Sequence, residues 1–260
     1  MPLEAVVNKP VALTIAGSDS GGGAGVQADL KTFRDHGVFG TSAIAAVTAQ
    51  NTTGVTRVDA VPVDGLRAQI EAVLEDLPVG AVKIGMLGTA DHVRCVADVL
   101  RGCDLPVVLD PVMVASTGAR LLERDAVEAL RHELLPLASL VTPNLPEAAL
   151  LADGSLLTWA SRCPVPLLVT GGDADDAVVR DSLYLPGHEP QVFTAARVPV
   201  SGAHDGFHGT GCTLSSAIAA RLARGEELVQ AVEGGIAYVQ ALVAGAWSPG
   251  AGHRVLLHGI

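Results

Sequence analysis

Short apolar runs that end in glycine or in a polar residue recur along this 260-residue chain, and most are followed by a helical pattern. The run 11–16 (VALTIA) ends at Gly17, the run 106–110 (PVVLD) ends in an acid, and the run 140–142 (LVT) leads into a helix start. Continuous aliphatic runs of this length are typical of strands that are buried on both faces. Alternation of such strands with helices favours an α/β fold, with a mostly parallel central sheet covered by helices on both faces.

The rest of the chain continues this pattern. Residues 181–200 indicate a late β-hairpin that turns at Pro186-Gly187, and no Pro/Gly/Ser-rich linker divides the chain. We therefore expect one domain over residues 1–260. Further strands are expected over 41–49, 81–85 and 166–170, and further helices after Ala24, over 64–76 with Asp64 as the cap, and over 226–247.

The composition restricts the partners and the compartment. The formal net charge of −11 disfavours nucleic acid and anionic membranes, because an acidic surface offers neither a counterion. The four cysteines have neither CxxC spacing nor metal-ligand spacing, which favours free thiols in a reducing cytoplasm. We therefore expect a cytoplasmic protein with a small-molecule substrate, no nucleic-acid partner and no membrane partner.

A glycine-rich turn, Gly209-Thr210-Gly211-Cys212, runs directly into an alanine-rich helix. Glycine permits a close approach of the backbone, and the start of a helix offers unpaired N–H groups and a positive dipole end. This combination predicts an anion hole for a phosphate group in transfer. The same field favours a Cys212 thiolate that acts as a base or as a polar contact. The alternative is an ordinary helix entry with Cys212 as a small buried hydrophobe.

Four candidates for substrate binding come from the first half of the chain. The loop 17–25 follows a strand, where ligands of α/β sheets bind, and Asp29 in the next helix is placed to face the same pocket. Gln50 offers a donor and an acceptor together, which suits the edge of a heterocycle. Met86 belongs either to the core or to the pocket wall. The alternatives are a flexible surface loop at 17–25 and an ordinary loop position for Gln50.

A second group of residues suits a hydrated cation. Asp110 closes a buried strand, where a carboxylate is costly unless it faces a site or a cation. Asn144 and Glu147, three residues apart, share one helix face, so both can turn oxygens toward a Mg²⁺ ion that keeps most of its waters. The alternative is an N-cap asparagine with a glutamate in the first helical turn.

Six segments together carry a resemblance to a known family. In this order along the chain, they resemble the hydroxymethylpyrimidine/phosphomethylpyrimidine kinases of thiamine biosynthesis, in the ribokinase superfamily. The segments are IAGSDSGGGAGVQADLKTF (15–33), AVTAQNTTGV (46–55), KIGMLG (83–88), VVLDPVM (107–113), VTPNLPEAALL (141–151) and HGTGCTLSSAIAA (208–220).

The resemblance implies a ribokinase-like three-layer fold and ATP- and Mg²⁺-dependent phosphorylation of the hydroxymethyl group of a pyrimidine, then of its monophosphate. By position it implies that Gln50 binds the aminopyrimidine and that Gly209 to Cys212 form the anion hole, with Cys212 where relatives place an aspartate base. We also expect a homodimer. The implied substrate neighbours are Gly17, Asp29, Met86 and Val112, the nucleotide-binding residues are Asn144, Thr170 and Gly172, and the metal ligands are Asp110, Asn144 and Glu147.

The chain departs from the family pattern at three places. Thr170 stands where a lysine is usual, and Phe207 stands where a threonine is common. Between Leu151 and Pro166 the chain is shorter, which predicts the loss of a helix with its loop. Two alternatives therefore stay open. One is a pyridoxal or pyridoxine kinase of the same architecture, in which Cys212 can add to an aldehyde. The other is a pyrimidine-binding homologue with little activity.

We expect Thr170→Lys to favour the second phosphorylation over the first. A neutral hydroxyl cannot offset the charge that builds up when an acceptor already carries a phosphate, whereas a lysine can. The wild type should therefore phosphorylate the hydroxymethylpyrimidine faster than its monophosphate, and the variant should narrow this gap. The measurement is kcat/KM for both acceptors. An unchanged ratio would mean that Lys31, Arg120 or a second Mg²⁺ already supplies the charge.

Overall fold

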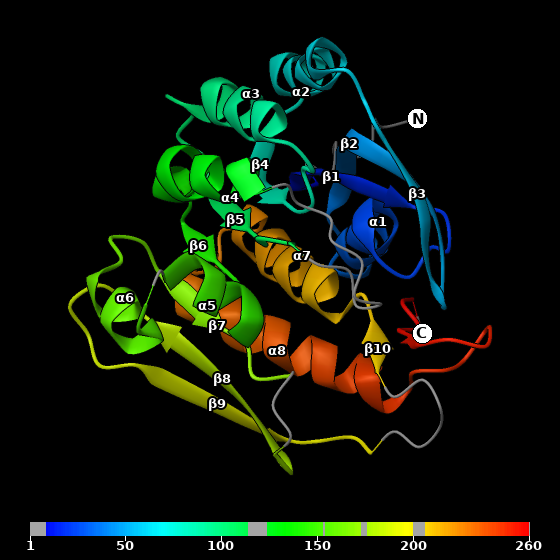
Figure 1. Ribbon diagram of the computed structural model, residues 1–260, viewed down its shortest axis with the longest axis vertical. Helices are drawn as coiled ribbons and strands as arrows, with labels where there is room; N and C mark the ends of the chain where they lie inside the picture. The colour runs from blue at the N-terminus through cyan, green and yellow to red at the C-terminus, as the bar shows by residue number, and fades with distance from the viewer. Residues whose placement is uncertain (1–8, 114–123, 153, 173–175, 200–205, 260) are drawn as a thin grey trace, which may run out of the picture.

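The computed structural model describes residues 9–113, 124–152, 154–172, 176–199 and 206–259. A nine-stranded sheet in the order β3-β2-β1-β4-β5-β6-β7-β8-β9 crosses the molecule (Figure 1). Its six strands from β2 to β7 are mutually parallel, and the pairs β2–β3, β7–β8 and β8–β9 are antiparallel. The strands are β1 (Val11–Asp19), β2 (Phe39–Asn51), β3 (Gly54–Ala60), β4 (Val79–Ile84), β5 (Val107–Leu109), β6 (Leu140–Val141), β7 (Leu167–Val169), β8 (Val178–Tyr184) and β9 (Gln191–Ala196).

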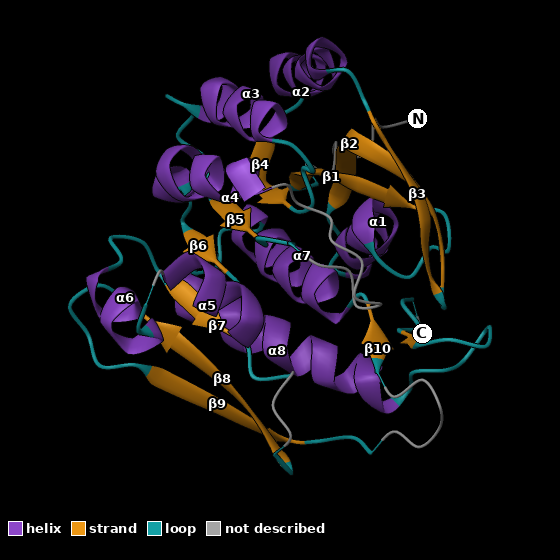
Figure 2. Ribbon diagram, in the orientation of Figure 1, coloured by secondary structure: helices purple, strands orange, loops and turns teal. Residues whose placement is uncertain are grey.

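Helices cover both faces of the sheet (Figure 2). One layer contains α2 (Val63–Asp76), α3 (Ala90–Leu100), α4 (Arg124–Ala129), α5 (Leu145–Ala152) and α6 (Leu156–Arg162), with a π-helical turn (Leu130–Leu134) and a 3-10 turn (Leu135–Leu137) after α4. The other layer contains α1 (Gly25–Asp35), α7 (Thr210–Ala223) and α8 (Leu228–Ala244). The expected three-layer α/β fold is confirmed.

Each helical layer has its own apolar core against the sheet. Ile70 of α2 and Val93 of α3 belong to the first core, and Phe33 of α1 and Ile218 of α7 belong to the second. Side chains that alternate along the inner strands enter opposite cores, because successive strand residues point to opposite faces. Thus Leu13 enters the first core, and its neighbour Ala12 enters the second.

The late hairpin is confirmed as β8–β9, but a second hairpin at the other sheet edge was not expected. Strand β2 is longer than 41–49 and turns back into β3, so Gln50 lies inside a hairpin rather than after a strand. Asn51 Oδ1 stabilises the turn by accepting from Thr53 N at 2.9 Å and Gly54 N at 3.2 Å. Strand β3 is largely exposed and polar, so it lacks the apolar pattern that indicates a strand.

Two local expectations are corrected. Helix α2 begins at Val63 after Pro62, and Asp64 lies inside the helix rather than at its cap, where its carboxylate accepts from the adjacent Gly65 N at 2.9 Å. The segment between Leu151 and Pro166 does contain a helix. This is α6, whose N-cap Ser155 accepts from Thr158 N.

The C-terminal segment contacts both the start of the glycine-rich turn and the β2–β3 hairpin. Strand β11 (Arg254–Val255) pairs with β10 (Phe207–His208), directly before the glycine-rich turn. His253 N also donates to Thr52 O, 2.9 Å away in the turn between β2 and β3. These contacts hold His208 beside the β2–β3 hairpin. Within the described ranges, no helix combines the length and the apolarity that a bilayer crossing requires.

Candidate functional site

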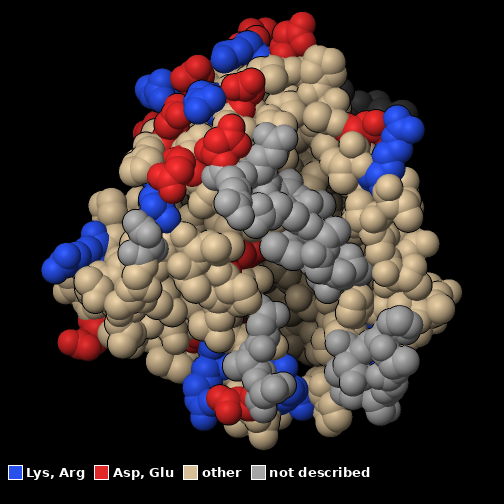
Figure 3. All heavy atoms as spheres, in the orientation of Figure 1, with Lys and Arg blue, Asp and Glu red and all other residues tan. Residues whose placement is uncertain are grey.

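A cavity of about 200 Å³ lies at the carboxyl ends of the central strands. Exposed charged side chains gather over α2 and α3 instead, where pairs such as Arg94 with Asp91 lie on the surface (Figure 3). The charged side chains that line the cavity, such as Lys83 and Asp110, are buried instead. Its lining includes Gly17, Asp19, Thr48, Gln50, Lys83, Met86, Asp110, Val112, Thr142, Asn144, Glu147, Thr170, Phe207, His208 and Gly209 to Cys212.

Most residues predicted for the site therefore lie in one cavity, although they come from distant parts of the chain. Met86 lines it, so it belongs to the pocket wall as well as to the buried residues. Two predicted residues do not line it. Asp29 is fully buried, and Gly172 is exposed outside the cavity. Asp29 as a direct substrate ligand is thus wrong for this arrangement.

Two glycines let the glycine-rich turn lie against the first loop. Gly209 is the N-cap of α7 and has a left-handed backbone with φ 83°. A Cβ atom there would collide with Gly23 O, so only glycine permits this approach. Among the residues that the structure describes, no side chain caps α7, and its start lines the cavity. The helix start is therefore available to an anionic group, as the anion-hole interpretation requires.

The prediction of a ready Cys212 thiolate is wrong. Burial raises the pKa of Cys212 to about 12, against the opposing effect of Lys83, while Asp110 and Asp29 raise it further. Removal of the thiol from water thus outweighs the field of the helix start. At neutral pH the group in the cavity is a thiol.

Asp110 is a carboxylate that lacks enough positive charge around it. Burial raises its pKa to about 6, although Lys83 lowers it and Ser215 Oγ donates to Asp110 Oδ2 at 3.2 Å. A cation in the cavity would remove this penalty.

Lys83 and Asp29 form a buried ion pair beneath the cavity. Lys83 Nζ lies 2.9 Å from both carboxylate oxygens of Asp29, and both side chains are 0% exposed. Thr14 Oγ1 and Ser216 Oγ also donate to this carboxylate, at 2.6 and 2.7 Å. Burial lowers the pKa of Lys83, but the combined effect of Asp29, Cys212 and Asp110 outweighs it and the net shift is upward. Asp29 therefore holds Lys83, the one Lys or Arg side chain among the described cavity residues.

Asn144 and Glu147 cap α5 reciprocally. Glu147 N donates to Asn144 Oδ1 at 2.9 Å, and Asn144 N donates to Glu147 Oε2 at 3.0 Å. The alternative of an N-cap with a first-turn glutamate is thus present, and both residues still line the cavity. The described residues contain no group of three or more His, Cys, Asp or Glu side chains able to hold a metal ion. A cation here would therefore depend on few carboxylates, with water and phosphate as its other ligands, which fits Mg²⁺.

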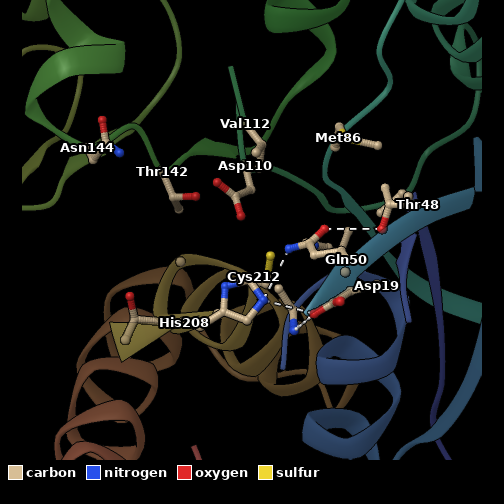
Figure 4. A pocket seen from close by; sticks show the side chains of 18 of the residues that line it. Asp19, Thr48, Gln50, Met86, Asp110, Val112, Thr142, Asn144, His208 and Cys212 are labelled. Carbon is tan, nitrogen blue, oxygen red and sulfur yellow. Dashed lines mark hydrogen bonds and ion pairs between the residues drawn. The ribbon is translucent and has the colours of Figure 1, made fainter. Parts of the chain in front are cut away.

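Asp19 and His208 are site residues that the sequence interpretation missed. Asp19 Oδ1 accepts from Gly21 N at 2.8 Å, and Oδ2 accepts from Gly23 N at 3.0 Å and Ala24 N at 2.9 Å. His208 Nε2 lies 2.9 Å from Asp19 Oδ2 (Figure 4). Burial raises the pKa of Asp19, but these hydrogen bonds and the His208 charge outweigh it and the net shift is downward. The signal that could have found Asp19 is an acid inside a glycine-rich loop, where carboxylates often cap backbone N–H groups.

The positions that depart from the family pattern differ in their surroundings. Thr170 lines the cavity, and its backbone N donates to Pro143 O at 3.0 Å beside Asn144. Phe207 also lines the cavity. Of the cations named as substitutes for the missing lysine, Lys31 is exposed and donates to Gly22 O at 2.7 Å. Arg120 lies outside the described residues.

Comparisons with known proteins agree with the fold and identify the family. The family model described as phosphomethylpyrimidine kinase matches residues 19–256. A hydroxymethylpyrimidine/phosphomethylpyrimidine kinase of Rhizobium meliloti is 48% identical over 91% of each chain, and that of Escherichia coli is 42% identical over 94% of each.

Solved structures are similar over almost the whole chain. An ADP complex of Bacillus subtilis pyridoxal kinase has a TM-score of 0.86 and 32% identity, over 96% of this chain and 97% of that one. A phosphomethylpyrimidine kinase from Clostridium difficile has a TM-score of 0.77 and 38% identity, over 90% of this chain and 100% of that one.

We expect Lys83→Met to destabilise the protein by about 3–5 kcal/mol, because it leaves the Asp29 carboxylate buried without its cation. The double variant Lys83→Met/Asp29→Leu should recover much of this loss. Arg57→Met is the control, since Arg57 pairs with Asp59 on the surface and should matter little. Urea denaturation gives the free energy of unfolding for each variant. A double variant as unstable as Lys83→Met would contradict the interpretation.

Proposed function

The chain belongs to the phosphomethylpyrimidine kinase family, and from this membership we propose how its cavity works. The proposed reaction transfers phosphate from ATP to the hydroxymethyl group of 4-amino-5-hydroxymethyl-2-methylpyrimidine, and then to the resulting monophosphate, in thiamine biosynthesis. One observation supports it most. A single cavity contains Gln50, which suits an aminopyrimidine edge, and the Gly209 to Cys212 helix start, which suits a phosphate.

The pyrimidine would bind at the β1 and β2 side of the cavity. Gln50 supplies the paired donor and acceptor, Met86 and Val112 supply apolar wall, and Gly17 leaves room for the ring. A Cβ atom at Gly17 would collide with Met86 Cε, so the glycine also leaves space for the Met86 side chain. Bound in this way, the pyrimidine would direct its hydroxymethyl group toward the start of α7.

Transfer would occur against the start of α7. The hydroxymethyl oxygen forms the new bond to the γ-phosphorus, the bond to the oxygen of the leaving ADP breaks, and the hydroxyl proton passes to an oxygen of the transferred phosphoryl group and from there to water. Backbone N–H groups at Gly211 and Cys212 would stabilise the charge on the transferring group. Such transition states are loose and need little deprotonation of the acceptor beforehand. Cys212 as a thiol is thus better suited to contact the transition state than to act as a ready base.

The nucleotide side of the cavity would lie at the ends of β6 and β7. Asn144, Thr170 and Gly172 are the proposed nucleotide-binding residues, and Asp110, Asn144 and Glu147 would hold Mg²⁺ with the help of water and phosphate. Bound there, Mg²⁺ supplies positive charge to the phosphates during transfer. The raised pKa of Asp110 supports this assignment, because a buried carboxylate gains most from a nearby cation.

A pyridoxal or pyridoxine kinase is the second candidate, because a pyridoxal kinase of Bacillus subtilis shares the fold at a TM-score of 0.86. ADP release by the purified protein, measured as kcat/KM with the aminopyrimidine and with pyridoxal, separates the two. A protein that binds the pyrimidine without releasing ADP would be the weakly active homologue instead.

We also propose a cytoplasmic homodimer. All four cysteines are free thiols, which suits a reducing compartment. The dimer rests on the family resemblance, and light scattering of the purified protein tests it.

Cys212→Ala should lower kcat by roughly 10² to 10³-fold, as expected for the loss of one contact to the transition state, while pyrimidine binding stays largely intact. Cys103→Ala is the matched control, since Cys103 is an exposed free thiol that does not line the cavity. Steady-state kinetics with saturating ATP measure the effect. Full turnover by Cys212→Ala would remove the thiol from the mechanism.

Gln50→Ala should weaken pyrimidine binding by about 1 to 3 kcal/mol, because it leaves a donor and an acceptor of the ligand unmatched. ATP affinity should change little. Calorimetry with each ligand separates the two effects, and unaltered pyrimidine affinity would contradict the assignment.

A further inference from the structure

Four side chains at the pyrimidine end of the cavity form a chain of polar contacts (Figure 4). His208 Nε2 lies 2.9 Å from Asp19 Oδ2 and 3.2 Å from Gln50 Nε2. Gln50 Oε1 lies 3.1 Å from Thr48 Oγ1, and Thr48 Oγ1 lies 2.8 Å from Ser18 O. Asp19 and His208 are both nearly fully buried, with side chains 3% and 5% exposed.

The proton on His208 Nε2 follows from Asp19. The Asp19 carboxylate accepts hydrogen bonds from three backbone N–H groups, so it is an acceptor and cannot donate to the ring. A short contact between Asp19 and an unprotonated ring nitrogen would bring two lone pairs together. His208 Nε2 must therefore carry the proton, and it is a donor toward everything it faces.

This proton determines which end of the Gln50 amide faces His208. An amide NH₂ group directed at the protonated Nε2 would bring two donors together, whereas the amide oxygen can share the proton with Asp19. The structure draws the NH₂ group toward His208 and the oxygen toward Thr48. The two orientations of a terminal amide occupy almost the same volume and differ by a 180° rotation, so the hydrogen-bond partners decide between them. Thr48 fits the same orientation. Its single hydroxyl proton can serve only one of Ser18 O at 2.8 Å and the Gln50 amide at 3.1 Å, and when the shorter contact takes it, Oγ1 is an acceptor for the NH₂ group.

We propose that Asp19 and His208 are positioning residues for substrate recognition, which hold the Gln50 amide with its oxygen toward His208 and its NH₂ group toward Thr48. This inference rests on the proposed function and deepens it. The cavity then presents an acceptor on the His208 side and a donor on the Thr48 side, in a fixed order. A ligand edge fits only when its amino group lies on the His208 side and its ring nitrogen on the Thr48 side.

The fixed order favours a heterocycle that has an amino donor next to a ring acceptor. An analogue without the amino group leaves the Gln50 oxygen without its ligand donor, and a wrongly placed acceptor would face that oxygen. Without the His208 proton the amide can rotate. The cavity would then still bind a ring, but it would no longer prefer a ring with an amino donor next to a ring acceptor. Asp19 also connects His208 to the first loop, because the same carboxylate accepts hydrogen bonds from the backbone N–H groups of Gly21, Gly23 and Ala24.

The test compares His208→Phe with His208→Gln, which keeps an N–H donor near the position of Nε2. His208→Phe should raise KM for the aminopyrimidine about 3- to 10-fold, as expected for one lost hydrogen bond. Its preference over the analogue without the amino group should fall by a similar factor, while KM for ATP stays unchanged. His208→Gln should restore most of the preference. In the Gln50→Ala background, His208→Phe should have no further effect on this preference.

An equal effect of His208→Phe with and without Gln50, or an unchanged preference, would overturn the inference. Histidine ¹⁵N NMR of the free protein gives a separate readout, since it shows directly whether Nε2 carries the proton, and an unprotonated Nε2 would also overturn it. A wild type that does not phosphorylate the aminopyrimidine would instead contradict the proposed function, and the NMR measurement would still decide the state of His208.

Discussion

The buried ion pair between Lys83 and Asp29 connects the parts of the structure that form the site. It joins β4 to α1, and the hydrogen bonds from Thr14 and Ser216 add β1 and α7. A buried ion pair contributes little net stability, because the loss of hydration offsets the attraction, but removing one partner is costly. The four elements are therefore held in one arrangement. In that arrangement the start of α7 faces the carboxyl ends of the central strands.

Close backbone contact makes this arrangement specific. The left-handed Gly209 meets Gly23 O, so the first loop and the glycine-rich turn lie directly against each other. Asp19 caps the same loop, and β11 holds β10 and with it His208. A cavity that includes residues from 16 to 212 is thus held by a few short-range contacts between segments far apart in the chain. Preorganised donors of this kind need no rearrangement when charge develops during transfer.

The charges around the cavity leave room for positive charge from a ligand. Lys83 is balanced by Asp29, while burial raises the pKa values of Asp110 and Cys212. Burial therefore disfavours negative charge in the cavity unless a cation binds there. This condition suits a site where a metal ion and a polyphosphate bind together, because each offsets the charge of the other.

The sequence by itself determined the strand–helix alternation, the late hairpin and the grouping of most site residues. Strands buried on both faces have a continuous apolar pattern, and polar residues directly after such strands meet at one sheet edge. The exposed strand β3 lacked that pattern, so its hairpin, which contains Gln50, was not predicted.

Only the tertiary structure decided which polar side chains line the cavity and which are buried in pairs that hold the surrounding elements together. Asp29 is in the first turns of a helix next to the site, and its distance from Lys83 along the chain hid the pair that buries it. The local rule for Cys212 predicted a thiolate, but burial among Asp29, Lys83 and Asp110 made it a thiol. His208 and Asp19 are 189 positions apart, so no local pattern reveals their contact. Desolvation and pairing depend on neighbours that the fold brings together, and those neighbours cannot be identified from local sequence patterns.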